Sequence, residues 1–389
     1  MKDVFIVDGL RTPIGGLGKS LKSVSAVDLA GIVIKALLKK HKIKKDSVDE
    51  VILGNAVSAG LGQNPARQSL VRAGLSPEIP AFTVNKVCGS GLKSVILAAQ
   101  AILCGDADII IAGGTENVSQ CPYFFSRDTK KEDLNKTDTR DSLINDGLWC
   151  SFSGVHMGEI ADYTAEKFEI SREEQDKYAL ESHQKACRTQ EKGLFQSEIV
   201  PVKVEGDHVF SIDEKPRKNT SMEKLGRIPP AFKPDGTVTA GNSPAPADGA
   251  AALILASGEG LRKNKIAPTA RILGYTTVAV EPKLVFTAAA LAVEKCLKKS
   301  SIKIEDVDLF EINEAFAVQA ILTNRLTGLD TKRLNIFGGT IALGHPLGAS
   351  GARGLVTVMN SLRSQKKEIG ITSVCLGGGC AISLAVQMI

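Results

Sequence analysis

Two stretches of the chain repeat one pattern of apolar and polar positions. Residues 34–49 (IKALLKKHKIKKDSVD) align without a gap with residues 293–308 (VEKCLKKSSIKIEDVD), and seven positions are identical. In each copy the apolar residues recur three and four positions apart, which predicts an amphipathic helix. A strand-like run follows each helix, EVILGN at 50–55 and LFEIN at 309–313. The pattern therefore predicts two copies of one βαβ-rich unit, one near each end of an α/β protein.

Shorter matches extend the repeat beyond the first helix and strand. SGLK (90–93) corresponds to SGAR (350–353), and IAGG (111–114) is aligned with CLGG (375–378). The apolar run DGAAALILAS (248–257) is expected to rejoin the sheet of the first copy. Two such units placed face to face would bring residues from the two ends of the chain into one site.

The sequence between the copies has a different character. It holds a polar stretch at 126–141, an amphipathic helical pattern at 171–186 and a run rich in proline and glycine at 227–249. This mixture predicts an inserted lobe rather than a linker. We therefore expect a first half at 1–117 with 248–268, an inserted lobe at 118–247, and a second half at 269–389.

Composition and charge narrow the class of protein. At 389 residues, with 43% hydrophobic and 23% charged residues, the chain has the composition of a globular enzyme of two or three domains. No apolar run is expected to span a membrane, and the absence of a charged leader favours a cytoplasmic location. Eight cysteines without metal-type spacing predict reduced thiols rather than disulfides or a zinc site. The net charge of +5 gives no indication of nucleic-acid binding.

Cys88 is the first candidate for chemistry. It lies in VNKVCGSGLK (84–93), between a strand-like segment and a long predicted helix. Unpaired N–H groups and the positive end of the helix dipole favour a thiolate over a thiol, so the sequence predicts a lowered pKa for Cys88. Gly89 and Gly91 leave room for a substrate to approach the sulfur.

Three further polar residues lie at the ends of hydrophobic runs in the last quarter of the chain. Asn313 lies in INEAF (312–316), His345 in GGTIALGHPLGASG (338–351) and Cys375 in CLGGGC (375–380). A thiolate serves both as nucleophile and as leaving group for an acyl group, and a histidine or a second cysteine can act as acid or base. Together with Cys88, these residues predict acyl-thioester chemistry.

The motifs together resemble those of the thiolase family, the acetyl-CoA C-acyltransferases. VCGSG, NEAF, GHPLGASG and CLGGG occur in the family's order and spacing, and the resemblance covers the whole chain from LRTPIGG (10–16) onward. It implies two duplicated βαβ-rich halves with mixed five-stranded sheets in an αβαβα layered arrangement. It also implies that the inserted loop domain binds coenzyme A.

The resemblance implies a role for each candidate. Cys88 would carry the acyl group, His345 would take its proton, and Cys375 would move the α-proton. The backbone N–H of Gly377 would form one oxyanion site, and His345 with a water held by Asn313 would form the other. Coenzyme A would be a substrate, with no metal or organic cofactor, and the family implies a homotetramer or homodimer without a nucleic-acid or membrane partner.

Further positions match family contacts to coenzyme A, whereas others depart from the family. The predicted contacts are His156, Met157, Arg217, Phe232, Ala240, Ser243, Ala315 and Phe316. The departures are Ser243–Pro244 after TAGN, the segment VFTAAALA (285–292), Phe337 and Cys380. Three functions stay open: an acetyl-CoA acetyltransferase, favoured by HMG at 156–158; a 3-ketoacyl-CoA thiolase for longer or dicarboxylic chains; and a thiolase-like protein that binds acyl-CoA without turnover.

Overall fold

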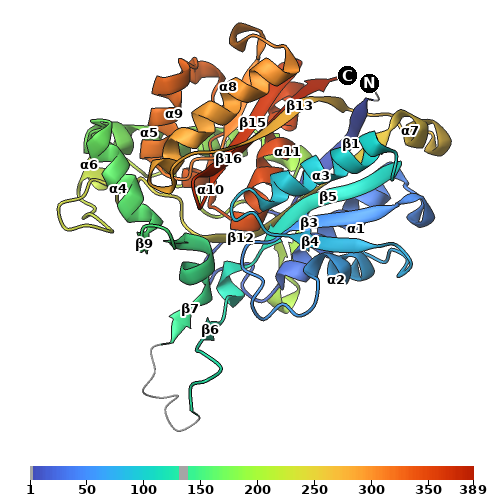
Figure 1. The fold of residues 1–389 in the computed structure, drawn as a ribbon, viewed down its shortest axis with the longest axis horizontal. Helices are drawn as coiled ribbons and strands as arrows, with labels where there is room; N and C mark the ends of the chain where they lie inside the picture. The colour runs from blue at the N-terminus through green and yellow to red at the C-terminus, as the bar shows by residue number, and fades with distance from the viewer. Residues whose placement is uncertain (1–2, 131–138) are drawn as a thin grey trace.

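The backbone forms five alternating layers of helix and sheet (Figure 1). The computed structural model describes residues 3–130 and 139–389. The strands of the first half are β1 (Val4–Arg11), β2 (Gly15–Gly16), β3 (Glu50–Gly54), β4 (Ala81–Val84), β5 (Ile109–Glu116) and β12 (Ala247–Ser257). Those of the second half are β13 (Ala270–Ala279), β14 (Leu309–Ile312), β15 (Ile369–Leu376) and β16 (Cys380–Met388).

The two halves repeat one strand order. The first runs β4-β3-β5-β12-β1 and the second β14-β15-β16-β13, with β2 pairing to β12. In the first half β3 is parallel to both β4 and β5, and in the second half β14 is parallel to β15. The remaining strand pairs of each half are antiparallel. Each half is thus a mixed sheet built from one repeated unit, and the α/β class with duplicated halves is confirmed.

The strand count of the second half differs from the expectation. The place corresponding to β4 holds an isolated parallel bridge between Phe310 and Leu334 instead of a strand. The chain turns immediately afterwards, because Asn335 has a φ of 44° and its side chain bonds back to the backbone of Ile312. The halves are also joined edge to edge, since Phe5 and Ile6 of β1 pair with β13. Hydrogen bonds therefore run through the strands of both halves, while the two halves remain two sheets on opposite sides of the central helices α3 and α11.

One part of the sequence repeat was aligned in the wrong register. Asp49 accepts hydrogen bonds from the N–H groups of Asp108 and Ile109, both at 2.7 Å. Asp308 makes the same pair of contacts to Glu368 and Ile369, at 3.1 and 3.0 Å. Ile109 therefore corresponds to Ile369, and IAGG (111–114) corresponds to residues 371–374. CLGG begins at residue 375, four positions after residue 371. The glycines of the two runs are not equivalent.

The central layer consists of α3 (Ser90–Cys104) and α11 (Leu347–Gln365). These helices approach closely, because a Cβ atom on Gly91 would lie 2.8 Å from the carbonyl oxygen of Gly348. The outer layers contain α1 (Ala26–His41) and α2 (Pro65–Arg72) on the first half, and α8 (Ala288–Ser300) with α9 (Ala317–Thr327) on the second. The starts of α3 and α11 thereby meet in the middle of the protein (Figure 1).

The helix α3 contradicts one expectation from composition. Residues 87–104 form a window long and apolar enough to cross a membrane, by length and composition only. Over half of this window is buried inside the protein, where α3 packs on β3, β5 and α11. A core helix passes the same test, because hydropathy does not distinguish a protein interior from lipid.

The segment between the halves contributes short elements beside the large sheet. It includes β6 (Tyr123–Phe124), β7 (Arg140–Asp141), β8 (Trp149–Cys150), β9 (Val155–His156), β10 (Val202–Lys203), β11 (Val209–Phe210), α4 (Met157–Lys167), α5 (Arg172–Glu191) and α6 (Met222–Gly226). The helix expected at 171–186 is confirmed as α5, with Ser171 and Glu174 forming a capping box. Part of the polar stretch 126–141 lies outside the described residues, and the domain boundaries remain a prediction.

The remaining helices are short connections. They are α7 (Gly258–Asn264), α10 (Thr340–Leu343), the π-helix η4 (Leu143–Leu148), and the 3-10 helices η1 (Lys45–Ser47), η2 (Val118–Gln120), η5 (Leu194–Ser197), η6 (residues 205–207), η7 (Pro282–Thr287), η8 (Ile304–Asp306) and η9 (Thr331–Arg333). Two of them position the site described next, because η4 and η7 each supply residues to the wall of the same cavity.

Candidate active site

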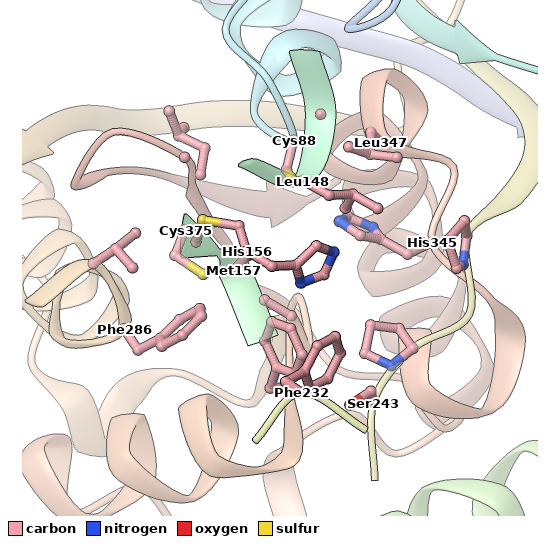
Figure 2. Close-up of a pocket in the computed structure, with 18 residues that line it drawn as sticks. Cys88, Leu148, His156, Met157, Phe232, Ser243, Phe286, His345, Leu347 and Cys375 are labelled. Atoms are coloured by element: carbon pink, nitrogen blue, oxygen red, sulfur yellow. The ribbon is translucent and has the colours of Figure 1, made fainter. Parts of the chain in front are cut away.

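Cys88, His345 and Cys375 face one cavity of about 260 Å³ (Figure 2). Cys88 comes from the first half of the chain, His345 and Cys375 from the second, and part of the wall from the inserted segment. The residues that line the cavity are Cys88, Gly147, Leu148, His156, Met157, Phe232, Ser243, Pro244, Pro246, Val285, Phe286, Ala315, Phe316, His345, Leu347, Cys375, Leu376 and Gly377. The structure thus brings together residues that the face-to-face arrangement of the repeats was expected to join.

Cys88 lies on a strained turn between β4 and α3. The preceding residue, Val87, has a φ of 47°, which a β-branched side chain rarely adopts. Ser90 holds this turn, because its hydroxyl accepts from the N–H of Lys86 at 2.8 Å and donates to the carbonyl of Val87 at 2.6 Å. Asn85 also accepts from the N–H of Val87, at 2.9 Å. These contacts fix the direction of the Cys88 side chain.

The predicted lowering of the Cys88 pKa is wrong for the protein without substrate. Burial raises the pKa of the thiol to about 12, and the charge of Glu116 adds to the increase. The N–H groups of Cys88 and Gly377 act in the opposite direction but are outweighed. Cys88 also precedes Gly89, the N-cap of α3, so it lies outside the first turn where the helix dipole is strongest. At neutral pH the group is therefore a thiol that needs a base.

His345 is placed to be that base. Burial and the nearby charge of Arg353 lower its pKa to about 3, so the imidazole is neutral. Its Nδ1 lies 2.7 Å from the hydroxyl of Ser350, which donates its own proton to the carbonyl of Pro346 at 2.9 Å. The hydroxyl must then accept from Nδ1–H, which leaves the lone pair on Nε2.

Cys375 lies at the end of β15 and is buried. Burial raises the pKa of its thiol, and the neighbouring Cys88 raises it further. The glycines that follow form the tight turn into β16, since Gly378 and Gly379 have φ values of 84° and 80°. This turn directs the N–H of Gly377 toward the sulfur of Cys88, so the run both makes a turn and supplies a donor to the site.

Asn313 is not among the residues that line the cavity. The residue is buried, and in the described part of the chain neither its amide oxygen nor its amide nitrogen has a hydrogen-bond partner. A buried amide without partners is costly in free energy, so a water or a substrate atom is expected to satisfy it. Its own N–H is held by the carbonyl of Ser373 at 2.8 Å, which fixes the backbone of the NEAF segment.

The predicted coenzyme A contacts fall into two groups. His156, Met157, Phe232, Ser243, Ala315 and Phe316 line the main cavity. Arg217 and Ala240 line a smaller neighbouring cavity of about 30 Å³, which Ser243 also borders. The hydroxyl of Ser243 is buried without a hydrogen-bond partner in the described chain. Because Ser243 lines both cavities, its hydroxyl is available to a ligand that extends from one toward the other.

The departures from the family also separate into two groups. Pro244, Val285 and Phe286 line the main cavity, and the ring of Phe286 packs edge-on to Phe316 at 5.4 Å. Phe337 instead packs against Phe195 in a separate core cluster, at 5.7 Å. Neither Phe337 nor Cys380 is among the residues that line the cavity. The substitutions that bear on the acyl group are therefore those at 244, 285 and 286.

Two buried residues beside the site were not predicted from the sequence. Ser350 sets the tautomer of His345, and Glu116 contacts the loops that carry the reactive side chains. Only the fold places Glu116 there, because no sequence spacing links it to His345. Across residues 3–130 and 139–389, no group of three or more His, Cys, Asp or Glu residues is arranged to hold a metal ion.

Comparison with known proteins identifies the family of the whole chain. The chain matches the family descriptions "Thiolase, N-terminal domain" over residues 4–259 and "Thiolase, C-terminal domain" over 266–388. An acetyl-CoA acetyltransferase of Escherichia coli is 45% identical over 100% of this chain and 99% of its own. The crystal structures of a Bacillus anthracis acetyl-CoA acetyltransferase (37% identical, TM-score 0.97) and of human mitochondrial 3-ketoacyl-CoA thiolase (39% identical, TM-score 0.95) each cover 100% of this chain and 99% of their own.

Proposed function

The chain belongs to the thiolase family, and on this basis we propose that it is an acetyl-CoA C-acetyltransferase. It would interconvert two acetyl-CoA molecules with acetoacetyl-CoA and coenzyme A. The observation that carries the proposal is the meeting of Cys88, His345 and Cys375 at one cavity. A cytoplasmic location, and activity without a metal or organic cofactor, are part of the same proposal.

The residues can carry out thiolysis in two half-reactions. Nε2 of His345 takes the proton of Cys88, and the sulfur attacks the 3-keto carbonyl. The carbon–carbon bond breaks, and the thiol of Cys375 protonates the resulting enolate to give acetyl-CoA. The raised pKa of Cys375 keeps it protonated for this step. Coenzyme A then attacks the acyl-Cys88 thioester, while the Cys375 thiolate takes its proton and Cys88 recovers its own from His345.

Two donor sets would stabilise the negative charge that develops on oxygen. The N–H groups of Cys88 and Gly377 converge near the sulfur, where the acyl oxygen would lie. Asn313 supplies an unpartnered amide for a water that would complete the second site with His345. Removal of one such donor typically costs roughly 3–4 kcal/mol of transition-state stabilisation.

The size and lining of the cavity favour a short acyl group. Its walls are largely apolar, and Phe286 lies on the side of Cys375 (Figure 2), where its ring packs edge-on against Phe316. A chain longer than acetoacetyl would have to displace these rings. This favours the acetyltransferase over a thiolase for longer or dicarboxylic chains, and the presence of all three reactive side chains disfavours a protein that only binds acyl-CoA.

The test is coenzyme A-dependent cleavage of acetoacetyl-CoA beside 3-ketohexanoyl-, 3-ketodecanoyl- and 3-oxoadipyl-CoA. Turnover confined to acetoacetyl-CoA is expected. Preference for a longer or dicarboxylic substrate would replace the acetyltransferase assignment by a 3-ketoacyl-CoA thiolase. A folded protein without turnover on any of them would leave acyl-CoA binding as its function.

The two cysteines can be separated by substitution. Cys88→Ser should abolish covalent acylation, because a serine hydroxyl is a far weaker nucleophile and leaving group than a thiol. Cys375→Ser should still form acetyl-Cys88 from acetyl-CoA but lose condensation by about 10²–10⁴-fold, the usual contribution of an acid–base group. Mass spectrometry of the intact protein and an acetoacetyl-CoA assay measure the two steps. Normal condensation by Cys375→Ser would remove Cys375 from the assigned role.

A further inference from the structure

Glu116 is a fully buried carboxyl group at the end of β5, beside the site but outside the proposed reaction steps. Burial raises its pKa to about 7, and its hydrogen bonds from N–H groups act in the opposite direction and favour the carboxylate. One carboxylate oxygen accepts from the side-chain amide of Asn55 at 2.8 Å and from the N–H of Val57 at 3.2 Å. The other accepts from the N–H groups of Ala56 at 3.0 Å and Gly348 at 2.8 Å. Both oxygens are thus saturated by four N–H donors from two separate parts of the fold.

These donors belong to the loops that position the reactive side chains. Gly348 lies in the first turn of α11, three residues after His345. Residues 55–57 lie beside Cys88: the side chain of Asn85 donates to the carbonyl of Ala56 at 2.9 Å, and Val57 packs in one apolar cluster with Cys88 and Leu347. Glu116 therefore ties the start of α11, in the second half, to the support of Cys88, in the first.

Because the fold is duplicated, the contact between Glu116 and Gly348 occupies a place similar to that of the contact between Gly377 and Cys88. Cys88 stands two residues before Ser90 of SGLK, and Gly348 stands two residues before Ser350 of SGAR. Gly377, after the end of β15, directs its N–H toward Cys88, whereas Glu116, at the end of β5, accepts the N–H of Gly348. The same junction of strand end and helix start thus occurs twice, once facing the substrate and once as an internal contact.

The two halves pack tightly at this junction. A Cβ atom on Gly348 would lie 2.8 Å from the Cα of Asn55 and 2.9 Å from a carboxylate oxygen of Glu116. The start of α11 is therefore in direct contact with the first half through backbone and Glu116. Burial raises the pKa of the thiols of Cys88 and Cys121, and the charge of Glu116 adds to both increases. Asp141 and Asp248 raise the pKa of Cys121 further.

We propose that Glu116 is a positioning residue for the thiolase reaction, holding His345 and Cys88 in register across the two halves through its four N–H contacts. The proposal rests on the proposed function for its kinetic part. A displacement of about 1 Å between reacting groups is enough to cost on the order of 10²-fold in rate. Glutamine cannot replace the carboxylate, because its amide nitrogen would face N–H donors.

Two variants separate geometry from charge. Glu116→Gln should lower kcat for acetoacetyl-CoA thiolysis by about 10²-fold with KM within about twofold, and should shift the pH profile of Cys88 alkylation by iodoacetamide to lower pH. Glu116→Asp keeps the charge but is one methylene shorter, so it should lose kcat similarly and leave the alkylation profile in place. Peptide mapping identifies alkylation at Cys88 among the eight cysteines.

Asp248→Asn is the matched control, because Asp248 is also a buried carboxylate of the first half but contacts Ser119, at 3.1 and 2.5 Å. It should leave kcat and the Cys88 profile near those of the unsubstituted protein. Retention of kcat by Glu116→Gln, or an equal loss in Asp248→Asn, would overturn the proposal, as would an alkylation profile unchanged in Glu116→Gln. If the unsubstituted protein cleaves no 3-ketoacyl-CoA, the proposed function fails, and the alkylation profiles still decide the effect of Glu116 on Cys88.

Discussion

Cys88 and His345 meet in the protein as a neutral thiol and a neutral imidazole, because burial disfavours the charged form of each. It raises the pKa of the thiol to about 12 and lowers that of the imidazole to about 3. In the proposed mechanism, proton transfer between them accompanies attack of the sulfur on a carbonyl, whose developing charge the N–H of Gly377 would stabilise. The reactive thiolate would then form with substrate bound.

This protonation state predicts the pH dependence of Cys88 alkylation without substrate. Below a pKa of about 12 the thiolate fraction rises about tenfold for each pH unit, so the iodoacetamide rate at Cys88 should climb steadily from pH 7 to pH 10. Cys104 is exposed and serves as the internal reference thiol. A plateau for Cys88 below pH 8 would show instead that it forms a thiolate–imidazolium pair with His345.

Ser350 should matter for activity because it selects the tautomer of His345. Ser350→Ala removes the acceptor of Nδ1–H, so the lone pair is no longer confined to Nε2, and kcat/KM should fall by roughly 10–100-fold, as for other partners that orient a histidine. Ser361 is the control, since it is buried on the same helix and donates only to the carbonyl of Val358. Steady-state kinetics with thermal unfolding compares the two. Equal kinetics for Ser350→Ala and Ser361→Ala would contradict the role.

At the scale of single elements, η7 sets one wall of the acyl cavity. Its residues Val285 and Phe286 are buried, and Phe286 packs against Phe316 next to Cys375. The sequence indicated that this segment departs from the family, whereas the structure shows which of its side chains reach the cavity. The adjoining helix α8 continues from η7 and packs on β13 and β16, so the position of the wall is fixed by the core of the second half.

Phe286→Ala should extend the accepted acyl chain. Loss of the ring opens space beside Cys375, so the ratio of kcat/KM for 3-ketohexanoyl-CoA to that for acetoacetyl-CoA should rise about tenfold or more, the scale of discrimination by a few methylenes. Substitution of a buried phenylalanine by alanine typically costs about 3–5 kcal/mol of stability. Phe337→Ala removes an equally buried ring away from the cavity, so it should share the stability loss and keep the original ratio. An unchanged ratio in Phe286→Ala would move the specificity determinant elsewhere.

The sequence patterns predicted the helices more accurately than the pKa of Cys88. The amphipathic spacing predicted α5 and the repeated first helices because burial of one helix face depends on local order. The alignment of IAGG with CLGG was wrong because the glycines of IAGG lie inside β5, whereas those of CLGG begin the turn after β15. The contacts of Asp49 and Asp308 reveal the true alignment. The predicted lowering of the Cys88 pKa was wrong because the residues that bury the thiol, and Glu116, come from distant segments that no local motif contains.

At the scale of the whole molecule, the two halves are equivalent in topology but not in chemistry. Cys88 lies just before the start of α3 and His345 just before the start of α11, and both helices belong to the central layer (Figure 1). One strand end provides the N–H of Gly377 to the site, and the other provides Glu116 to the scaffold. A single active site thus arises from a duplicated fold because equivalent junctions carry different side chains.

The open edge of the large sheet predicts self-association. Among residues 3–130 and 139–389, β4 is the last strand of the first half and pairs with β3 alone, and Phe82 on it is 38% exposed. An unpaired edge strand with an exposed aromatic residue favours pairing with another chain. Sedimentation velocity should therefore give a dimer or tetramer of the 41.2 kDa chain, in agreement with the assembly implied by the family resemblance.

Phe82→Glu should shift this assembly toward the monomer, because it places a charge where two copies of β4 would meet. Leu326→Glu is the control, since Leu326 is 46% exposed on α9, which lies on the second half and away from β4. Both variants should unfold at similar temperatures if the changes act only at the surface. Dissociation by Leu326→Glu but not by Phe82→Glu would place the interface on the second half, and a monomeric unsubstituted protein would show that the edge of β4 stays unpaired in solution.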